Sequence, residues 1–542
     1  MSEPARGVGP SAARRGGSAT GYRNNSTEPE SVNRWLITSC IILGTLMGAI
    51  DSSIVNVALP DMRASFGVTV TEISWVATGY LVAVVVILPL TAWLAAVVGR
   101  KRLYLIALVL FTVSSLLCGI SHGLTMLVFF RIAQGIGAGM MQPISMAILR
   151  EVFPPVEQAM AMGVFGIAIL LGPAIGPTLG GWLTDTYGWP WIFFINLPIG
   201  AVAMFMVSQF ITDPPYLVRQ RIHEIDAVGI FLLTLGLSSL QTVLSEGQTD
   251  DWFESPFIIA FTVIAAVALI AFVFWELRNR KPAVDLTILS SPSYTSATIL
   301  GGVLGLALFG SLFLLPLFMQ ELLGYDALQS GLAMMPRSLV MMIGMPIAGR
   351  LYNRVGPRTM VGAGLLFSGI ATLMMSRFTL DTSYLGLVMP QVWQGLAFSL
   401  IFVSLSTSAL ALVPRPRMTN AAALYNLVRQ IGGSFGIAIF ATMLESRQQA
   451  VSSRLMGHLD PLNPAFVQRY QTISQALAMR GVNPASAGQK TMALLNGLVQ
   501  QQAAVMSFQY AFFLIGALFI VTLPLVLLLR SRKHAIPTAP VP

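Results

Sequence analysis

The feature that most constrains the fold is a series of fourteen long apolar blocks. Each is long enough for a helix that crosses about 30 Å of hydrocarbon, which takes about 20 residues. Only 10% of the residues are charged, whereas soluble domains have about a quarter. The pattern predicts an all-α polytopic membrane protein and excludes a soluble core of this size. The blocks lie near 35–59, 73–98, 103–121, 124–149, 159–183, 190–211, 227–245, 255–275, 293–323, 328–352, 357–376, 384–413, 419–444 and 505–529.

The distribution of basic residues predicts the orientation. An even number of spans puts both termini on one side, and the segments predicted on that side hold 22 of the 32 Lys and Arg residues. The positive-inside rule therefore places both termini in the cytoplasm. The net charge of +9 follows from this bias and does not indicate nucleic-acid binding. Residues 1–34 are predicted to be a disordered cytoplasmic tail without a cleavable signal peptide, and 531–542 a second cytoplasmic tail.

Short segments recur in the same order in the two halves of the chain. Trp93–Arg102 is echoed by Arg350–Arg358 at an offset of 257 residues, and Arg131–Gly135 by Gln391–Gly395 at an offset of 260. Phe-Gly-Ile-Ala-Ile occurs at 165–169 and again at 435–439. Duplicated halves are common in transporters, whose substrate sites lie near the midplane between them. The repeat predicts a six-helix bundle at 35–212, an inserted helix pair with flanking loops at 213–285, and a second six-helix bundle at 286–530 that includes an outward loop at 445–504.

Several longer motifs follow one another in a characteristic order. They are Asp51–Pro60 (DSSIVNVALP), Arg131-x-x-Gln134-Gly135-x-Gly137, Gly172-Pro173-x-x-Gly176-Pro177-x-x-Gly180-Gly181, and Trp191–Gly200 (WIFFINLPIG). With these motifs the chain resembles the major facilitator superfamily, in particular its fourteen-helix drug:proton antiporter branch of the EmrB/QacA type. The resemblance implies the major facilitator fold over about residues 35–530. It also makes the glycine- and proline-rich run the antiporter motif, associated with exporters; ordinary tight helix packing is the alternative.

The loop after the second span departs from the family pattern. Ala92 and Ala96 stand where the family has Gly and Asp, and Asn353 takes the Asp position in the second copy. The conformational latch attributed to that carboxylate in relatives is therefore in doubt for this chain, although the basic residues can still bind anionic headgroups or helix C-terminal carbonyls. The predicted conformational-loop residues are Gly99, Arg100, Lys101, Arg102, Asn353, Arg354 and Gly356.

Few ionisable residues lie inside the spans, where a charge costs about 2.5–3.5 kcal/mol on insertion scales. Asp51 in the first span and Arg131 in the fourth are at similar depth, and the resemblance implies that both spans line one cavity. Because a nearby Arg and burial shift a carboxylate pKa in opposite directions, we expect Asp51 to exchange a proton and Arg131 to modulate it. The alternative is a static ion pair that holds two helices together. The other ionisable residues near or inside spans are Arg337, Arg429, Glu72 and Glu321.

Other polar residues inside the spans are candidates for the substrate cavity. Each could bind a substrate or simply hydrogen-bond a neighbouring helix. They are Asn56, Gln134, Gln142 and Arg429.

Enzyme signatures do not occur in the sequence. There is no His-Glu-x-x-His, P-loop or Gly-x-Ser-x-Gly motif, and none of the four histidines lies deep in a span. We therefore predict no catalytic site, no metal site and no bound cofactor. The predicted function is proton-coupled multidrug efflux of small hydrophobic or amphipathic compounds across the inner membrane. Metabolite uptake or facilitated transport, and a receptor or scaffold that does not transport, are the alternatives.

The outward loop at 445–504 is far longer than the others. Its apolar spacing predicts two short amphipathic helices, at 464–480 and 488–504. The resemblance implies that this loop docks a periplasmic adaptor and, through it, an outer-membrane channel. A cap over the cavity mouth and a helix on the lipid surface are the alternatives.

Overall fold

The computed structural model describes residues 33–213, 226–279, 282–411, 413–457, 459, 462–479 and 484–529, and every regular element in these ranges is a helix. The predicted tails lie outside these ranges except for Asn33 and Arg34. The α-helices are α1 (Arg34–Phe66), α2 (Val70–Val98), α3 (Arg100–Gly119), α4 (Leu124–Val152), α5 (Gln158–Tyr187), α6 (Trp191–Phe194), α7 (Asn196–Phe210), α8 (Ala227–Glu246), α9 (Pro256–Arg278), α10 (Pro292–Glu321), α11 (Ala327–Val355), α12 (Pro357–Met375), α13 (Tyr384–Leu410), α14 (Met418–Met456), α15 (Pro464–Met479) and α16 (Pro484–Val521). Short 3-10 turns are η2 (Trp252–Glu254), η3 (Leu286–Ser290), η4 (Arg415–Arg417) and η5 (Leu523–Leu528).

Fourteen membrane spans are consistent with this set of helices. In the described residues, thirteen helical segments are long and apolar enough to cross a membrane, and α6 with α7 counts as one of them. The fourteenth is α5, whose parts Gln158–Pro173 and Ile175–Tyr187 meet at 41°. Pro173 and Pro177 account for the bend because each removes a backbone donor and its ring crowds the preceding turn. The fourteen predicted blocks each correspond to one of these spans.

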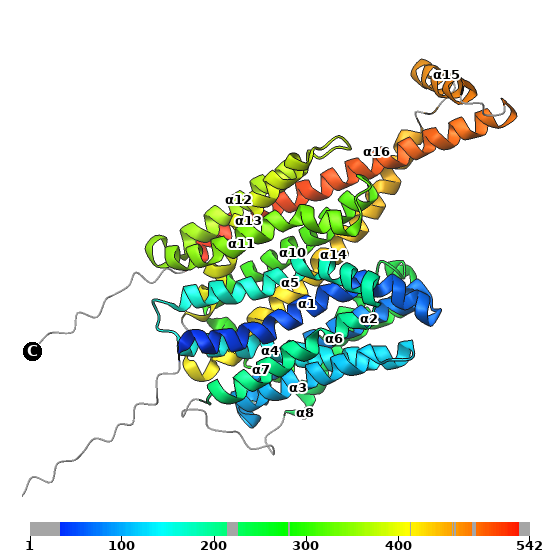
Figure 1. Ribbon diagram of the computed structural model, residues 1–542. Helices are drawn as coiled ribbons and strands as arrows, with labels where there is room; N and C mark the ends of the chain where they lie inside the picture. Colours follow the sequence, from blue (N-terminus) through cyan, green and yellow to red (C-terminus); the bar gives the residue numbers. More distant parts are fainter. Residues whose placement is uncertain are drawn as a thin grey trace, which may run out of the picture.

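The spans form two bundles that pack side by side (Figure 1). We call α1–α7 the N-half and α10–α16 the C-half. The halves meet where α5 packs against α11 and where α14 packs against α2 and α4. The first helix begins and η5 ends at the same end of the bundle, as Figure 1 shows. We call this end the termini end, and the opposite end the far end.

Of the inserted pair α8–α9, helix α8 contacts both halves near the far end. The Glu246 carboxylate accepts hydrogen bonds from the Ser74 and Thr78 hydroxyls of α2, with a Thr78 Oγ1–Glu246 Oε1 distance of 2.6 Å. On the other side, the Ser434 hydroxyl of α14 donates to Gln241 Oε1 at 2.9 Å. The pair therefore bridges the seam between α2 and α14.

At the termini end, Asp226 caps the inserted pair. Its carboxylate accepts hydrogen bonds from the Gly229 backbone N–H at 2.9 Å, Trp275 Nε1 at 2.8 Å and Asn279 Nδ2 at 2.7 Å. Burial alone would raise the pKa of Asp226, but these donors stabilise the ionised form and hold the pKa below its usual value. The side chain therefore joins the start of α8 to the end of α9.

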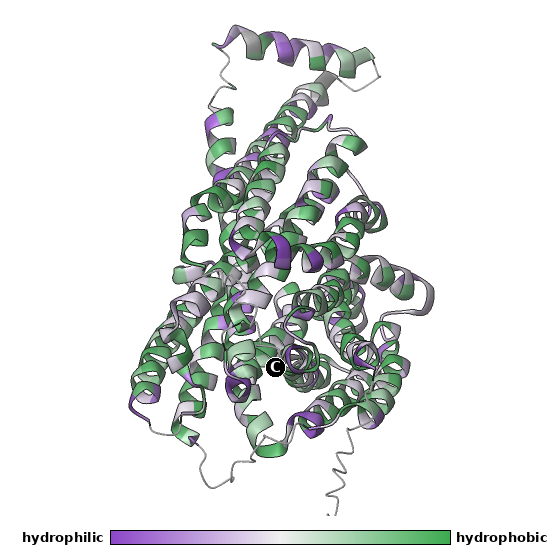
Figure 2. Ribbon diagram, turned by 90° about the vertical axis from the view of Figure 1, so that its left-hand side faces the viewer, coloured by the Kyte–Doolittle hydropathy of each residue, from purple (hydrophilic) through white to green (hydrophobic). Residues whose placement is uncertain are grey.

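Segment 445–504, predicted as a loop with two short helices, is helical over most of its described length, and the first of the two predicted helices is confirmed. Helix α14 continues to Met456, α15 occupies almost the predicted 464–480 segment, and the second predicted helix is the start of α16, a continuous helix of 38 residues. Polar Gln, Ser and Arg lower the hydropathy here, but Gln, Ala, Leu and Met are good helix formers, so the helices continue past the apolar blocks. Figures 1 and 2 show this region projecting from the far end, and we call residues 445–456, 464–479 and 484–504 the arm.

Candidate transport site

Asp51 is fully buried in the middle of the N-half, where three helices converge on its carboxylate. Arg131 Nη1 of α4 donates to Oδ2 at 2.6 Å. Gln134 Nε2 of α4 and Asn196 Nδ2 of α7 donate to Oδ1 at 2.9 and 3.2 Å. Both oxygens of the ionised form are thus satisfied, as a buried charge requires.

Arg131 is held by further contacts and is 1% exposed. Its Nη1 also donates to Gln134 Oε1 at 2.8 Å, and its Nε donates to the Val76 carbonyl at 3.2 Å. The guanidinium carbon lies 4.1 Å from the centroid of the Tyr80 ring, within the range of a cation–π interaction. The structure therefore brings the two predicted proton-coupling residues into one network, in which each charged group has several partners.

Three residues of this network were not assigned from the sequence. Asn196 belongs to the motif Trp191–Gly200, and its amide also donates to Ser115 Oγ at 3.0 Å. Ser115 in turn donates to the Phe193 carbonyl at 2.8 Å, and Tyr80 donates to the Gly48 carbonyl at 3.3 Å. Asn196 could have been found as a polar residue in a membrane-spanning motif, whereas Ser and Tyr are too common in spans to stand out.

The glycines of the predicted antiporter motif pack α5 against the stretch of α1 that carries Asp51. A Cβ on Gly172 would collide with the Ala49 backbone, one on Gly176 with the Ser53 hydroxyl, and one on Gly180 would lie 2.8 Å from Ile54 Cγ1. Gly181 faces a looser part of this contact. The motif therefore lets a bent helix, at the boundary between the halves, lie directly on the Asp51 segment.

A polar contact between the two halves lies closer to the termini end than the Asp51 network does. Arg429 Nη2 of α14 donates to Gln142 Oε1 of α4 at 3.2 Å and to Asn426 Oδ1 at 3.0 Å. Of the four predicted cavity residues, Gln142 and Arg429 therefore meet between the halves. Gln134 instead belongs to the Asp51 network, and Asn56 is exposed on α1.

The basic residues after α2 contact their own half. Arg100 is 2% exposed and forms an ion pair with Glu151 at the end of α4. The Lys101 backbone N–H donates to Asp213 Oδ1 at 2.8 Å, and Lys101 Nζ donates to the Ser208 carbonyl in the last turn of α7 at 2.7 Å. Gly99 has φ +95°, a left-handed conformation that favours glycine, and Arg102 is exposed.

The second copy of this loop contacts the other half. Asn353 Nδ2 donates to the Val156 carbonyl, between α4 and α5 of the N-half, at 2.6 Å. Gly356 has φ +85° and Arg354 is exposed. The amide at the family's Asp position therefore forms an uncharged link between the halves at the termini end.

The C-half contains a buried cluster at the positions equivalent to the Asp51 network. Arg337 Nη1 donates to Gln394 Oε1 at 2.9 Å, and Gln394 Nε2 donates to Ser311 Oγ at 3.0 Å. The repeat offsets place Ser311 opposite Asp51, Gln391 opposite Arg131, Gln394 opposite Gln134, and Arg337 opposite Tyr80.

Close backbone contacts support this correspondence. A Cβ on Gly135 would lie 2.5 Å from the Tyr80 carbonyl oxygen, and one on Gly395 would lie 2.6 Å from that of Arg337. The helices thus cross in the same way at both places.

This fold, with two duplicated helical bundles and a buried ion pair inside the first of them, defines a class of membrane transport protein. The family model of the Major Facilitator Superfamily matches residues 41–437. The chain belongs to the major facilitator superfamily. The fold also resembles the solved proton:xylose symporter XylE, with a TM-score of 0.60 over 92% of this chain and 96% of that one, at 11% sequence identity.

Among curated relatives, the multidrug export protein EmrB of Escherichia coli (strain K12) is 33% identical over 492 residues, which cover 91% of this chain and 94% of the relative. The fatty acid resistance protein FarB of Neisseria gonorrhoeae is 31% identical over 499 residues, which cover 92% and 96%. The similarity extends over almost the whole of each relative. Within the superfamily, the chain is therefore of the drug:proton antiporter type.

Proposed function

We propose that this chain exports small hydrophobic or amphipathic compounds across the cytoplasmic membrane in exchange for protons. The observation that carries the proposal is the fully buried Asp51 carboxylate and its ion pair with Arg131. The names of the relatives, a multidrug exporter and a fatty acid resistance protein, support the substrate class. The excess of basic residues at the termini end supports a cytoplasmic position for that end.

Protonation of Asp51 changes the network in a defined way. The carboxyl group then loses its charge, so the ion pair with Arg131 is lost and only a weaker hydrogen bond from the charged guanidinium remains. Arg131 keeps its bonds to Gln134 and to the Val76 carbonyl, so the guanidinium remains in place while α1 is held less tightly against α4. Since α5 lies on the same stretch of α1, the protonation state of Asp51 biases the contact between the halves.

The test is transport in liposomes that contain the purified protein and carry an imposed pH gradient. Asp51→Asn keeps the size of the side chain but cannot exchange a proton, so we expect gradient-driven substrate accumulation to be abolished. Glu246→Gln is the matched control, since it removes another buried carboxylate whose hydroxyl partners remain, and we expect coupling to persist. Normal accumulation by Asp51→Asn would make the ion pair static. Glu321 would then be the next candidate, because Glu72 forms a capping box with Thr69 at the start of α2.

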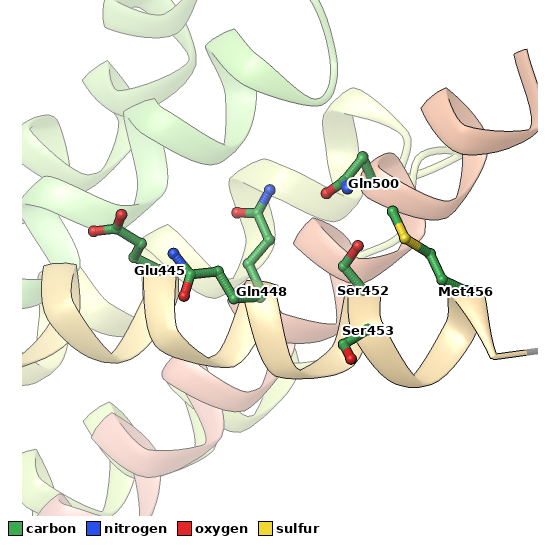
Figure 3. Close-up of a pocket in the computed structure, with 7 residues that line it drawn as sticks. Glu445, Gln448, Ser452, Ser453, Met456 and Gln500 are labelled. Atoms are coloured by element: carbon green, nitrogen blue, oxygen red, sulfur yellow. The ribbon is translucent and has the colours of Figure 1, made fainter. Parts of the chain in front are cut away.

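We further propose that the arm docks a periplasmic adaptor, which connects to an outer-membrane channel. A groove of about 550 Å³ lies between α14 and α16 where they leave the bundle (Figure 3). Six of its seven lining residues are of polar types, which suits a helical partner in water better than a lipid surface. The position of α15 at the tip of the arm, packed on α16, also favours docking over a cap on the cavity. The groove is lined by Glu445, Gln448, Gln449, Ser452, Ser453, Met456 and Gln500.

Replacement of 464–479 by a Gly-Ser linker, together with Gln448→Lys and Gln500→Lys in the groove, tests this role. Adaptor co-purification should be lost while transport in liposomes remains. Loss of liposome transport would instead assign the arm to the gating machinery.

A further inference from the structure

The C-half contains a buried cation for which the described residues provide no counter-charge. Arg337 lies in α11 and is 3% exposed. None of the described carboxylates lies within ion-pair distance of it, and its hydrogen bond to Gln394 uses one of five N–H donors. A buried cation without an anion is costly, and arginine does not escape the cost by losing its proton.

The repeat shows which group is missing. In the N-half the carboxylate of Asp51 neutralises Arg131, whereas the equivalent C-half position is Ser311, which is fully buried but uncharged. The cluster has the cation and the amide of the N-half network without its anion.

We propose that Arg337, Ser311 and Gln394 form a subsite for the carboxylate of an amphipathic anionic substrate. This inference rests on the proposed export function and specifies one class of compound that the site takes. A carboxylate matches the planar guanidinium with two parallel hydrogen bonds, and the Ser311 hydroxyl can donate a third. The apolar part of the compound would pack against the surrounding spans.

The depth of the cluster argues for a substrate and against a membrane lipid. Arg337 is ten residues into α11, and Gln394 ten residues into α13, so both are about 15 Å from the far end of their helices. An anionic lipid headgroup stays at the surface of the bilayer, about half the hydrocarbon thickness away.

Three variants separate the effect of the Arg337 charge on binding from the effect of side-chain size. Arg337→Gln removes the cation and keeps a hydrogen-bonding side chain. Ser311→Asp supplies an internal anion at the position where Asp51 faces Arg131. Ser311→Asn is the control for Ser311→Asp, because it has the same size but no charge.

The measurement is the dissociation constant of phenylbutyrate and of its neutral amide, phenylbutyramide, for the full chain in nanodiscs. We expect Arg337→Gln and Ser311→Asp each to weaken phenylbutyrate binding at least ten-fold, as expected for loss of a buried charge-assisted contact, and to leave phenylbutyramide binding unchanged. Ser311→Asn exchanges the hydroxyl donor for an amide donor without adding charge, so it should weaken phenylbutyrate binding much less than Ser311→Asp does. Should Arg337→Gln fail to fold, Ser311→Asp decides, because it neutralises the cation instead of removing it.

Two results would overturn the proposal. One is unchanged phenylbutyrate binding by Ser311→Asp. The other is a loss of phenylbutyrate binding in chloride buffer as large as the loss caused by Ser311→Asp, which would make the cluster a site for an inorganic counter-ion. Gradient-driven export of a neutral compound by the same variants separates this inference from the proposed function. If export of neutral compounds is absent even in the unmodified protein, the proposed function fails, whereas intact export with unaltered carboxylate binding refutes the subsite alone.

Discussion

The two buried clusters occupy equivalent positions in the two halves but distribute charge differently. In the N-half a titratable acid, Asp51, is paired with a fixed cation, whereas the C-half has only the fixed cation, Arg337. The glutamine that joins each cluster, Gln134 or Gln394, makes the same kind of contact in both. The duplicated backbone therefore provides the same scaffold twice, and the side chains placed on it decide which half can exchange a proton.

The largest difference between the clusters is expected when each arginine is neutralised. Arg131→Gln leaves the Asp51 carboxylate buried without a cation and should lower the free energy of unfolding by about 3–5 kcal/mol. Arg337→Gln removes a charge that no described carboxylate balances, so the free energy of unfolding should change by less than about 1 kcal/mol, or increase. Denaturant titration of both variants in the same detergent measures the two values.

A double variant checks the cause of this difference. Adding Asp51→Asn to Arg131→Gln removes the stranded charge and should restore most of the lost stability, giving a large coupling energy between the two positions. Equal losses for Arg131→Gln and Arg337→Gln would show that the C-half cluster also contains a compensating anion.

At positions where the two halves make the same backbone contact, equivalent substitutions should change the free energy of unfolding by equal amounts. Gly135→Ala and Gly395→Ala each place a Cβ against a backbone carbonyl oxygen of the neighbouring helix, at 2.5 and 2.6 Å respectively. Backbone cannot rotate away as a side chain can, so each variant should lose about 1–3 kcal/mol of unfolding free energy. Gly497→Ala in the arm meets open space and should have no such cost. A loss confined to one half would contradict the equivalence of the two crossings.

Whether a structural feature could be predicted from the sequence depends on the physical property that produces it. The spans and the inserted pair could be predicted, because the length of an apolar block reflects the thickness of the bilayer. The proximity of Asp51 and Arg131 could be predicted as well, since intramembrane charges are few and these two lie at similar depth. The continuation of α14 and α16 into the arm could not, because a hydropathy pattern reports the lipid boundary and not the end of a helix.

Contacts that depend on the packing of several helices were also beyond the sequence. Asn196, Tyr80 and Ser115 meet Asp51 and Arg131 only because α2, α3 and α7 fold around them. The unpaired state of Arg337 has the same origin, since a sequence shows that a charge lies in a span but not whether an acid faces it. Offsets of the repeat gave the equivalent positions, and the structure was needed to show which contacts those positions make.

The smallest expected effect concerns the two copies of the loop at the termini end. In the first copy Arg100 pairs with Glu151 of its own half, and Ala96 has no polar group, whereas in the second copy Asn353 donates to the Val156 carbonyl of the other half. Asn353→Asp restores the family residue but places an acceptor against an acceptor. The link would be lost, at a cost of about 1 kcal/mol, which corresponds to a shift of about five-fold in favour of separated halves.

Spin labels at positions 155 and 355, which flank this contact on the two halves, measure the shift as a change in the distribution of distances between them. Asn353→Asp should increase the longer-distance population about five-fold, as one lost hydrogen bond of about 1 kcal/mol implies. Arg354→Gln is the control, because its exposed side chain is not part of the link, and it should leave the distribution unchanged. If both variants shift the distances equally, the effect comes from the charge of the loop. If neither does, the packing of α5 against α11 alone holds this end closed, and the amide at position 353 makes no measurable contribution to the link between the halves.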